Sequence, residues 1–259
     1  MAYAIKRWAR ARRINCPGEG TLSSYGYLLL LIHFLQSRQP PVLPCLQLLD
    51  PPAESADAMP PRPPRGSDAY KVAHPTREAT VCDTYFFAPR TVAEAERLRA
   101  YAPPGGAPNT ESLGELFAGF FRFYAWDFDH ERHVVSARTG GRLERVIKAE
   151  ADGWPLHGRL AIEDPFETWY DVAHVLKLRS WRWMLAEMAR AWQLCAVAAT
   201  SSGAAGVPPL GSLLDAICAD APPPPFAKPA EEAADAAQKG ATDDADHDEA
   251  DLILSELLE

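Results

Sequence analysis

The chain has 259 residues, of which 47% are hydrophobic and 10% aromatic, enough to bury a substantial core. Its net charge of −9 belongs to the end of the chain, because from Ala221 onward eleven acidic side chains accompany only Lys228 and Lys239. Five scattered cysteines without a CxxC pair exclude a disulfide framework and a zinc finger, and favour a cytoplasmic or nuclear compartment. The apolar run Tyr27–Leu35 is too short to span a bilayer and no secretory signal opens the chain, so we expect no membrane partner.

The first predicted elements are helices. Residues Ala2–Arg13 predict a helix with one apolar face and a cluster of basic residues around it. No N-cap residue precedes it, so we expect the chain to begin inside an element rather than before one. Residues Thr21–Leu35 predict a second, strongly apolar helix. Residues 50–69 are proline-rich with few apolar anchors, and predict a disordered insertion.

The middle of the chain mixes short strands with helices. Thr80–Phe87 and Val134–Arg138 predict strands, and Val92–Tyr101 predicts a helix. Ser112–Trp126 is the clearest helix of the sequence, since its apolar residues recur at i, i+3 and i+4. These patterns predict a mainly α-helical fold with a small β-sheet, an α+β domain.

The last third predicts a loop, a long helix and a tail. Ile162–Phe166 reads as a loop, because Pro165 disfavours helix at the residue before it. A long helix is expected from about Trp169 or Asp171 to Ala198. We therefore expect one domain over residues 1–200 and a disordered acidic tail over 201–259, which could bind a protein partner.

Two pairs of side chains could suggest a metal site. Asp127 and Asp129 form a DxD pattern, and His130 and His133 follow closely. Nothing supplies further ligands at suitable spacing, and aspartates commonly cap turns, so we expect no metal ligand here.

Three segments in order are more specific than any single motif. They are IKRWARARRIN…GTLSSYGYLLLLIHFLQ…PPVLPCLQ, NTESLGELFAGFFRFYAWDFD…VVSARTG and AIEDPFETWYDVAHVL. Their content, order and spacing resemble the poly(A)-polymerase-associated domain of terminal uridylyltransferases and cytoplasmic-type poly(A) polymerases. The resemblance covers roughly Ala4 to Ala198 apart from the insertion, and implies the central nucleotide-recognition domain of a DNA polymerase β-like nucleotidyltransferase.

The resemblance implies a triphosphate site and a stacking residue near the start of the chain. Lys6 and Arg10 lie on one helical face and resemble the basic pair that holds the nucleoside triphosphate, with Ser24 as a further phosphate contact. Tyr25 resembles the aromatic residue on which the incoming base stacks. Taken alone, these residues could instead be a solvated basic face and a core aromatic at a helix start.

Base recognition is implied for Asp164, Glu167 and Tyr170, which occupy the loop that reads the base edge in this family. Carboxylates there accept hydrogen bonds from the base; the alternative is a turn aspartate and a glutamate at a helix N-terminus. Uridine-preferring members often have histidine where Tyr170 stands. Tyrosine is also bulky and can donate a hydrogen bond, so UTP is the expected substrate and ATP stays open.

The resemblance also implies an absence. The family's catalytic palm domain carries carboxylates that hold Mg²⁺ or Mn²⁺, and the match begins only at the basic helix, so we expect no catalytic residue and no metal ligand in this chain. The expected function is the nucleotide-recognition part of an RNA 3′-terminal nucleotidyltransferase, a partial product that is inactive alone, with an RNA 3′ end and a nucleoside triphosphate as its partners. The alternatives are a non-enzymatic RNA- or protein-binding module derived from that family, and a helical scaffold without a nucleotide site.

Overall fold

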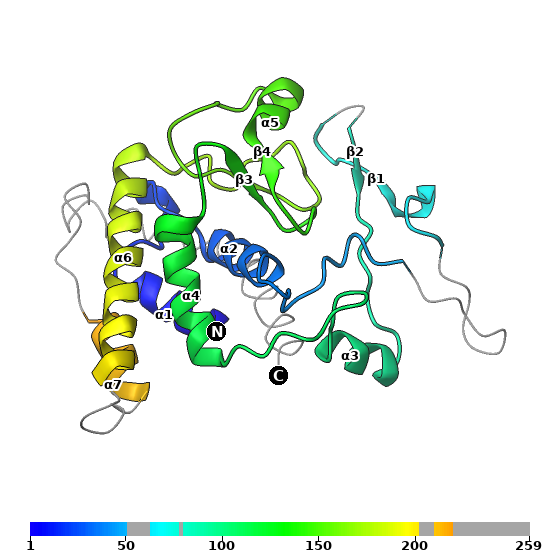
Figure 1. Cartoon of the computed structure of the whole chain (residues 1–259). Helices are drawn as coiled ribbons and strands as arrows, with labels where there is room; N and C mark the ends of the chain where they lie inside the picture. Colours follow the sequence, from blue (N-terminus) through cyan, green and yellow to red (C-terminus); the bar gives the residue numbers. More distant parts are fainter. Residues whose placement is uncertain (51–62, 78–79, 202–209, 220–259) are drawn as a thin grey trace. The chain divides into compact units, whose positions relative to one another are not determined.

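The computed structural model describes residues 1–50, 63–77, 80–201 and 210–219, all within the unit Met1–Ala221 (Figure 1). The described residues are mostly helical with small sheets, in line with the predicted fold class. Within these ranges, no helix is both long and apolar enough to cross a membrane. Of the insertion 50–69 and the tail 201–259 that were predicted to be disordered, residues 51–62, 202–209 and 220–259 lie outside these ranges.

The two helices predicted at the start of the chain are present. Helix α1 spans Ala2–Ala11 and buries Ile5, Trp8 and Ala9, the apolar face that the sequence indicates. Helix α2 spans Ser24–Gln36. Its start is fixed by Ser23, whose side chain accepts a hydrogen bond from the Gly26 amide and so satisfies one of the unpaired amides of the first turn.

Helix α4, Leu113–Arg122, begins with a capping box. The Ser112 hydroxyl accepts from the Glu115 amide, and the Glu115 carboxylate accepts from the Ser112 amide. The helix continues into a π-helical turn, η3, Phe123–Asp127, so the predicted helix Ser112–Trp126 is one continuous structure with a widened last turn.

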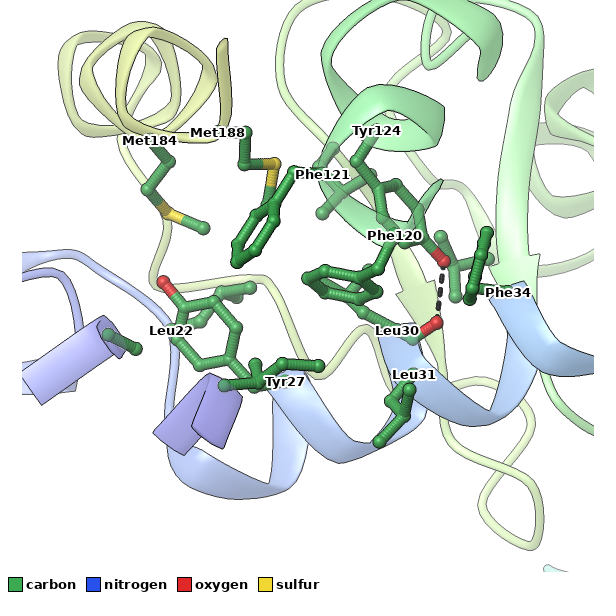
Figure 2. Close-up of a cluster of buried hydrophobic side chains, with 14 of the residues drawn as sticks. Leu22, Tyr27, Leu30, Leu31, Phe34, Phe120, Phe121, Tyr124, Met184 and Met188 are labelled. Carbon is green, nitrogen blue, oxygen red and sulfur yellow. Dashed lines mark hydrogen bonds between the residues drawn. The ribbon is translucent and has the colours of Figure 1, made fainter. Parts of the chain in front are cut away.

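The core lies where α2 and α4 meet the long helix α6, Leu178–Ser201 (Figures 1 and 2). Figure 2 shows aromatic and aliphatic side chains of all three helices converging, with a hydrogen bond of 2.8 Å from the Tyr124 hydroxyl to the Leu30 carbonyl. Gly119 allows the close approach of α4 to α2, because a Cβ atom there would lie 3.2 Å from the Phe34 ring.

A three-stranded sheet of order β4-β3-β5 adjoins the helices. Strand β3, His133–Ser136, pairs antiparallel with β4, Leu143–Glu144, and parallel with β5, Ile162–Glu163. Helix α5, Arg145–Asp152, separates β4 from β5, and neither α5 nor β4 was predicted from the sequence. The predicted loop Ile162–Phe166 is wrong at its first two residues, which form β5 by pairing with β3. The parallel pairing brings the segment after β5 next to the end of β3.

A β-hairpin and a small helix occupy the region after the insertion. Strands β1, Lys71–Ala73, and β2, Val81–Asp83, pair antiparallel; β2 lies inside the predicted strand Thr80–Phe87, and β1 was not predicted. The short helix η2, Asp68–Tyr70, precedes the hairpin, and α3, Val92–Arg99, follows it within the predicted helix.

The expected start of the long helix at Trp169 or Asp171 is wrong. Helix α6 begins at Leu178, because the preceding residues are held by hydrogen bonds within a turn and to other segments. The Asp171 carboxylate accepts from the amides of Ile162 and Ala173, and the Lys177 amide donates to the Gly20 carbonyl. These bonds to other elements outweigh the helical preference of the local sequence.

The described structure also adds a helix within the stretch expected to be tail. Helix α7, Leu210–Ile217, packs against α6, and Ile217 is fully buried. Arg190 of α6 donates to the carbonyls of Ala216 and Ile217 at the end of α7, and Arg12, the residue after α1, donates to the carbonyl of Ala219, two residues beyond it.

Candidate functional site

Tyr25 and Asp164, 139 positions apart in the sequence, meet through a hydrogen bond. Tyr25 lies in the first turn of α2, with the Ser23 cap before it, and its side chain is partly exposed. Its hydroxyl donates to Oδ2 of Asp164 at 2.9 Å. Burial, followed by the negative charge of Asp164, raises the pKa of the Tyr25 phenol well above its usual range. The ring is therefore anchored as a neutral donor.

Asp164 also organises the loop that follows β5. Its Oδ1 accepts hydrogen bonds of 2.9 Å from the amides of Phe166 and Glu167, which closes a tight turn. The Asp164 amide donates to the Tyr170 carbonyl, and the Tyr170 amide donates to the Glu167 carbonyl. The turn role considered from the sequence is thus present, and the second oxygen of the same carboxylate orients Tyr25.

Glu167 does not start a helix in the described structure. Its Oε1 lies 3.1 Å from Nε2 of His74, in the segment between β1 and β2. Sequence reasoning missed His74, because no local pattern relates the hairpin to a loop 93 positions later. The Arg77 and His74 side chains both pack on the ring of Trp169. Cζ of Arg77 lies 5.3 Å from the centroid of that ring, and the His74 ring centroid lies 5.5 Å from it. The hairpin therefore contacts the loop at two successive places.

Tyr170 lies at the exposed end of this loop, with 40% of its surface accessible. Its ring centroid is 5.1 Å from that of His174. Burial and then the nearby carboxylates of Asp171, Glu167 and Asp164 raise the pKa of the Tyr170 phenol. The hydroxyl therefore keeps its proton at neutral pH and can donate a hydrogen bond.

Ser24 lies beside Tyr25 at the start of α2. Its hydroxyl donates to Oδ1 of Asn15 at 3.1 Å, and Asn15 in turn donates to the Leu22 carbonyl. Asn15, which the sequence did not single out, thereby ties the segment after α1 to the first turn of α2. The unpaired amides of that turn and the helix dipole favour a negative group there.

Lys6 and Arg10 lie one turn apart on α1, on the side away from the buried face. Lys6 is half-buried and Arg10 is exposed. The structure brings Tyr25, Asp164, Glu167 and Tyr170 together by hydrogen bonds, and Lys6 and Arg10 lie on the neighbouring helix α1.

A buried ion-pair cluster lies at the start of the loop that follows β5. Glu163, 1% exposed, accepts hydrogen bonds from the Ser136 hydroxyl at 2.7 Å and from Arg138 at 3.1 Å, and its other oxygen lies 3.2 Å from Nζ of Lys148. Lys148 also donates to the Thr168 carbonyl inside the loop. The charge of the Glu163 carboxylate is thus neutralised by two cations, and these contacts hold the first residues of the loop in place.

The described residues offer no group of three or more His, Cys, Asp or Glu side chains that could hold a metal ion. Asp129 accepts hydrogen bonds from the amides of Glu131 and Arg132, and Asp127 pairs with Arg122 at 3.4 Å. These carboxylates are engaged by their own neighbours and do not fit a catalytic metal pair.

Comparison with protein families connects this site with known enzymes. Residues 112–169, which include Asp164 and Glu167, match the family model described as Cid1 family poly A polymerase. Terminal uridylyltransferase 4 of Mus musculus is 33% identical over 167 residues, which is 64% of this chain and 8% of that protein. Poly(A) RNA polymerase cid13 of Schizosaccharomyces pombe is 32% identical over 199 residues, 76% of this chain and 29% of that protein.

Solved structures agree with the sequence relatives. A cytoplasmic RNA terminal U-transferase superposes with a TM-score of 0.57 at 28% identity, covering 86% of this chain and 55% of that one. Cid1 bound to the UTP analog UMPNPP superposes with a TM-score of 0.54 at 29% identity, over 82% of this chain and 54% of that one. The chain thus spans about half the length of the solved relatives and less of the curated ones. Through its poly(A)-polymerase-associated domain, the chain belongs to the Cid1 family of terminal uridylyltransferases and poly(A) RNA polymerases.

Proposed function

We propose that this chain is the nucleotide-recognition part of an RNA 3′-terminal nucleotidyltransferase, with UTP as the favoured substrate and ATP as the alternative. The hydrogen bond between Tyr25 and Asp164 carries this proposal. It places a partly exposed, immobilised ring beside a loop rich in hydrogen-bond acceptors, which is what binding of a nucleobase requires. Structures of Cid1 with a UTP analog and with the product ApU support nucleotide and RNA as the ligands of the family.

The roles follow from the chemistry of each group. The Tyr25 ring stacks on the base, and Asp164 holds that ring in place. Glu167 accepts a hydrogen bond from an N–H of the base, and Tyr170 donates one to a base carbonyl, a pattern that suits the donor and acceptors of uracil. Lys6 and Arg10 attract the triphosphate, whose charge also favours the start of α2 at Ser24.

We further propose that the metal-binding carboxylates of the reaction lie outside this chain, in a palm domain. Magnesium accompanies nucleotides in structures of Cid1, for example with 3′-dATP, and when bound it supplies the positive charge that stabilises the leaving pyrophosphate. The residues of this chain would bind and orient the nucleotide only. A cytoplasmic location, with the nucleus as the alternative, follows from the cysteine pattern and is supported by the naming of one relative as a cytoplasmic U-transferase.

The stacking role of Tyr25 gives the test. Replacing it with alanine removes the platform, and we expect UTP binding by the full chain to weaken roughly five- to a hundredfold, since stacking of a base on an aromatic side chain is worth about 1–3 kcal/mol. Tyr25→Phe keeps the ring and loses its anchor on Asp164, so an intermediate loss is expected. Nucleotide titrations followed by NMR measure these weak dissociation constants.

The matched control is Tyr3→Ala, which removes an aromatic ring that is 80% exposed on α1. It is expected to leave UTP binding unchanged. If Tyr25→Ala binds UTP as tightly as the unmodified chain, Tyr25 is not the stacking platform. That result would favour the alternative of a helical scaffold without a nucleotide site.

A further inference from the structure

The backbone of its own segment selects one tautomer of the hairpin residue His74. Its Nδ1 accepts hydrogen bonds from the amide of Arg77 at 3.0 Å and from the amide of Thr76 at 3.2 Å. An atom that accepts from two amides carries a lone pair and no proton, so the ring hydrogen of the neutral imidazole lies on Nε2. His74 therefore faces Glu167 as a donor.

This donor engages only one side of the Glu167 carboxylate. Nε2 of His74 lies 3.1 Å from Oε1, while the Glu167 side chain stays 42% exposed. The His74 side chain is itself only 11% exposed and is backed by the Trp169 ring at 5.5 Å, so it is a fixed partner rather than a mobile surface group. When one oxygen of a carboxylate is held by a donor, the orientation of the other oxygen is also fixed. That second oxygen can then accept a hydrogen bond from a ligand.

We infer that His74 is a positioning residue for base recognition: by donating to Oε1 of Glu167, it orients the second oxygen of that carboxylate toward the base stacked on Tyr25. Nucleotide selection in this chain then depends on the β1–β2 hairpin as well as on the loop that follows β5. The inference rests on the proposed function, because it assigns Glu167 to the base edge.

The test is a set of dissociation constants for UTP, measured by NMR titration on the full chain. His74→Ala removes the donor, and we expect UTP binding to weaken about three- to tenfold, the effect of one hydrogen bond that orients a charged acceptor. His74→Gln supplies an N–H at the position of Nε2 and is expected to restore binding to within about twofold. Ribose 5′-triphosphate, which has no base, should bind His74→Ala and the unmodified chain equally.

A double-mutant cycle separates this role from a merely structural one. If His74 acts through Glu167, then His74→Ala has no further effect on UTP binding in a Glu167→Ala background. Lys71→Ala is the matched control, since it breaks the 2.7 Å ion pair with Asp83 on the same hairpin and leaves His74 untouched. It should change nothing in nucleotide binding.

Four outcomes overturn the inference. Effects of His74→Ala and Glu167→Ala that simply add, or an equal loss for UTP and ribose 5′-triphosphate, would mean that His74 only stabilises the hairpin. No effect of His74→Ala on UTP, in a chain where Tyr25→Ala does weaken it, would refute the inference alone. If the unmodified chain binds UTP no more tightly than ribose 5′-triphosphate, the base site itself is absent and the proposed function fails with it.

Discussion

Two tyrosines at the candidate site differ in what their hydroxyls do. The Tyr25 hydroxyl is engaged with Asp164, so it fixes a ring, whereas the Tyr170 side chain is 40% exposed and its proton is available to a ligand. Burial and surrounding carboxylates raise the pKa of both phenols, which keeps both protonated at neutral pH. Under the proposed function, Tyr25 therefore supplies stacking area and Tyr170 supplies a donor.

The donor role of Tyr170 predicts a change in base preference. Tyr170→Phe keeps the ring and loses the hydroxyl, so the preference for UTP over ATP should fall about three- to tenfold, because uracil presents carbonyl acceptors where adenine presents an amino group. Dissociation constants for both nucleotides measure this ratio. Tyr170→His should retain the preference, since imidazole can also donate. An unchanged ratio in Tyr170→Phe would remove Tyr170 from base selection.

At the scale of elements, a buried ion pair joins α1, α6 and α7. Arg12 of the segment ending α1 forms two hydrogen bonds with Glu187 of α6, at 2.7 Å and 2.9 Å, and both side chains are more than nine-tenths buried. Arg190 adds a third bond to the same carboxylate at 3.0 Å. Because these arginines also reach the carbonyls at the end of α7, the pair fastens the last described helix to the helix that carries Lys6 and Arg10.

Removing the negative charge of this cluster should destabilise the fold. Glu187→Gln leaves the buried Arg12 without its counter-charge, and we expect the free energy of unfolding at pH 7 to fall by about 3–5 kcal/mol. Chemical denaturation measures it. The control Glu111→Gln breaks a more accessible pair with Arg38 and should cost about 1 kcal/mol or less.

The same carboxylate gives a pH dependence with a definite sign. Burial alone would raise the pKa of Glu187, but hydrogen bonds and charge from Arg12 and Arg190 outweigh it, so the pKa lies below its ordinary value. A lowered pKa in the folded state contributes stability above the unfolded value of about 4.3, and this contribution is lost as the pH falls through the folded value. The difference between the unmodified chain and Glu187→Gln should therefore shrink below about pH 4. A difference that is constant with pH would contradict the charged pair.

At the scale of the whole molecule, the proposed division of labour predicts the outcome of an activity assay. The 259-residue chain, incubated with 3′-labelled RNA, Mg²⁺ or Mn²⁺ and each nucleoside triphosphate, should not extend the RNA, because the proposal places the metal-binding carboxylates elsewhere. Fusing a palm domain of a family member ahead of Met1 should restore extension, and Tyr25→Ala should weaken it. Robust extension by the chain alone would refute the proposed division.

Elements whose signals are local could be predicted from the amino-acid sequence. Helices α1, α2 and α4 were predictable because their apolar periodicity is local, and in α2 and α4 the capping side chain also lies within a few residues, as with Ser112 and Glu115. The family resemblance placed Tyr25 and Asp164 in one candidate site. In the structure, the Tyr25 hydroxyl lies 2.9 Å from Oδ2 of Asp164.

Features that depend on partners far apart in the chain could not be predicted and are visible in the folded structure. The start of α6 lies at Leu178 because Asp171 and Lys177 bond to other segments, and α7 packs against α6 where Arg190 and Arg12 bind carbonyls at and just after its end. The contact between His74 and Glu167 joins a hairpin to a loop with no pattern relating them. Each of these features is stabilised by hydrogen bonds and burial between segments far apart in the chain. Local sequence propensity does not include those energies, so it could not predict them.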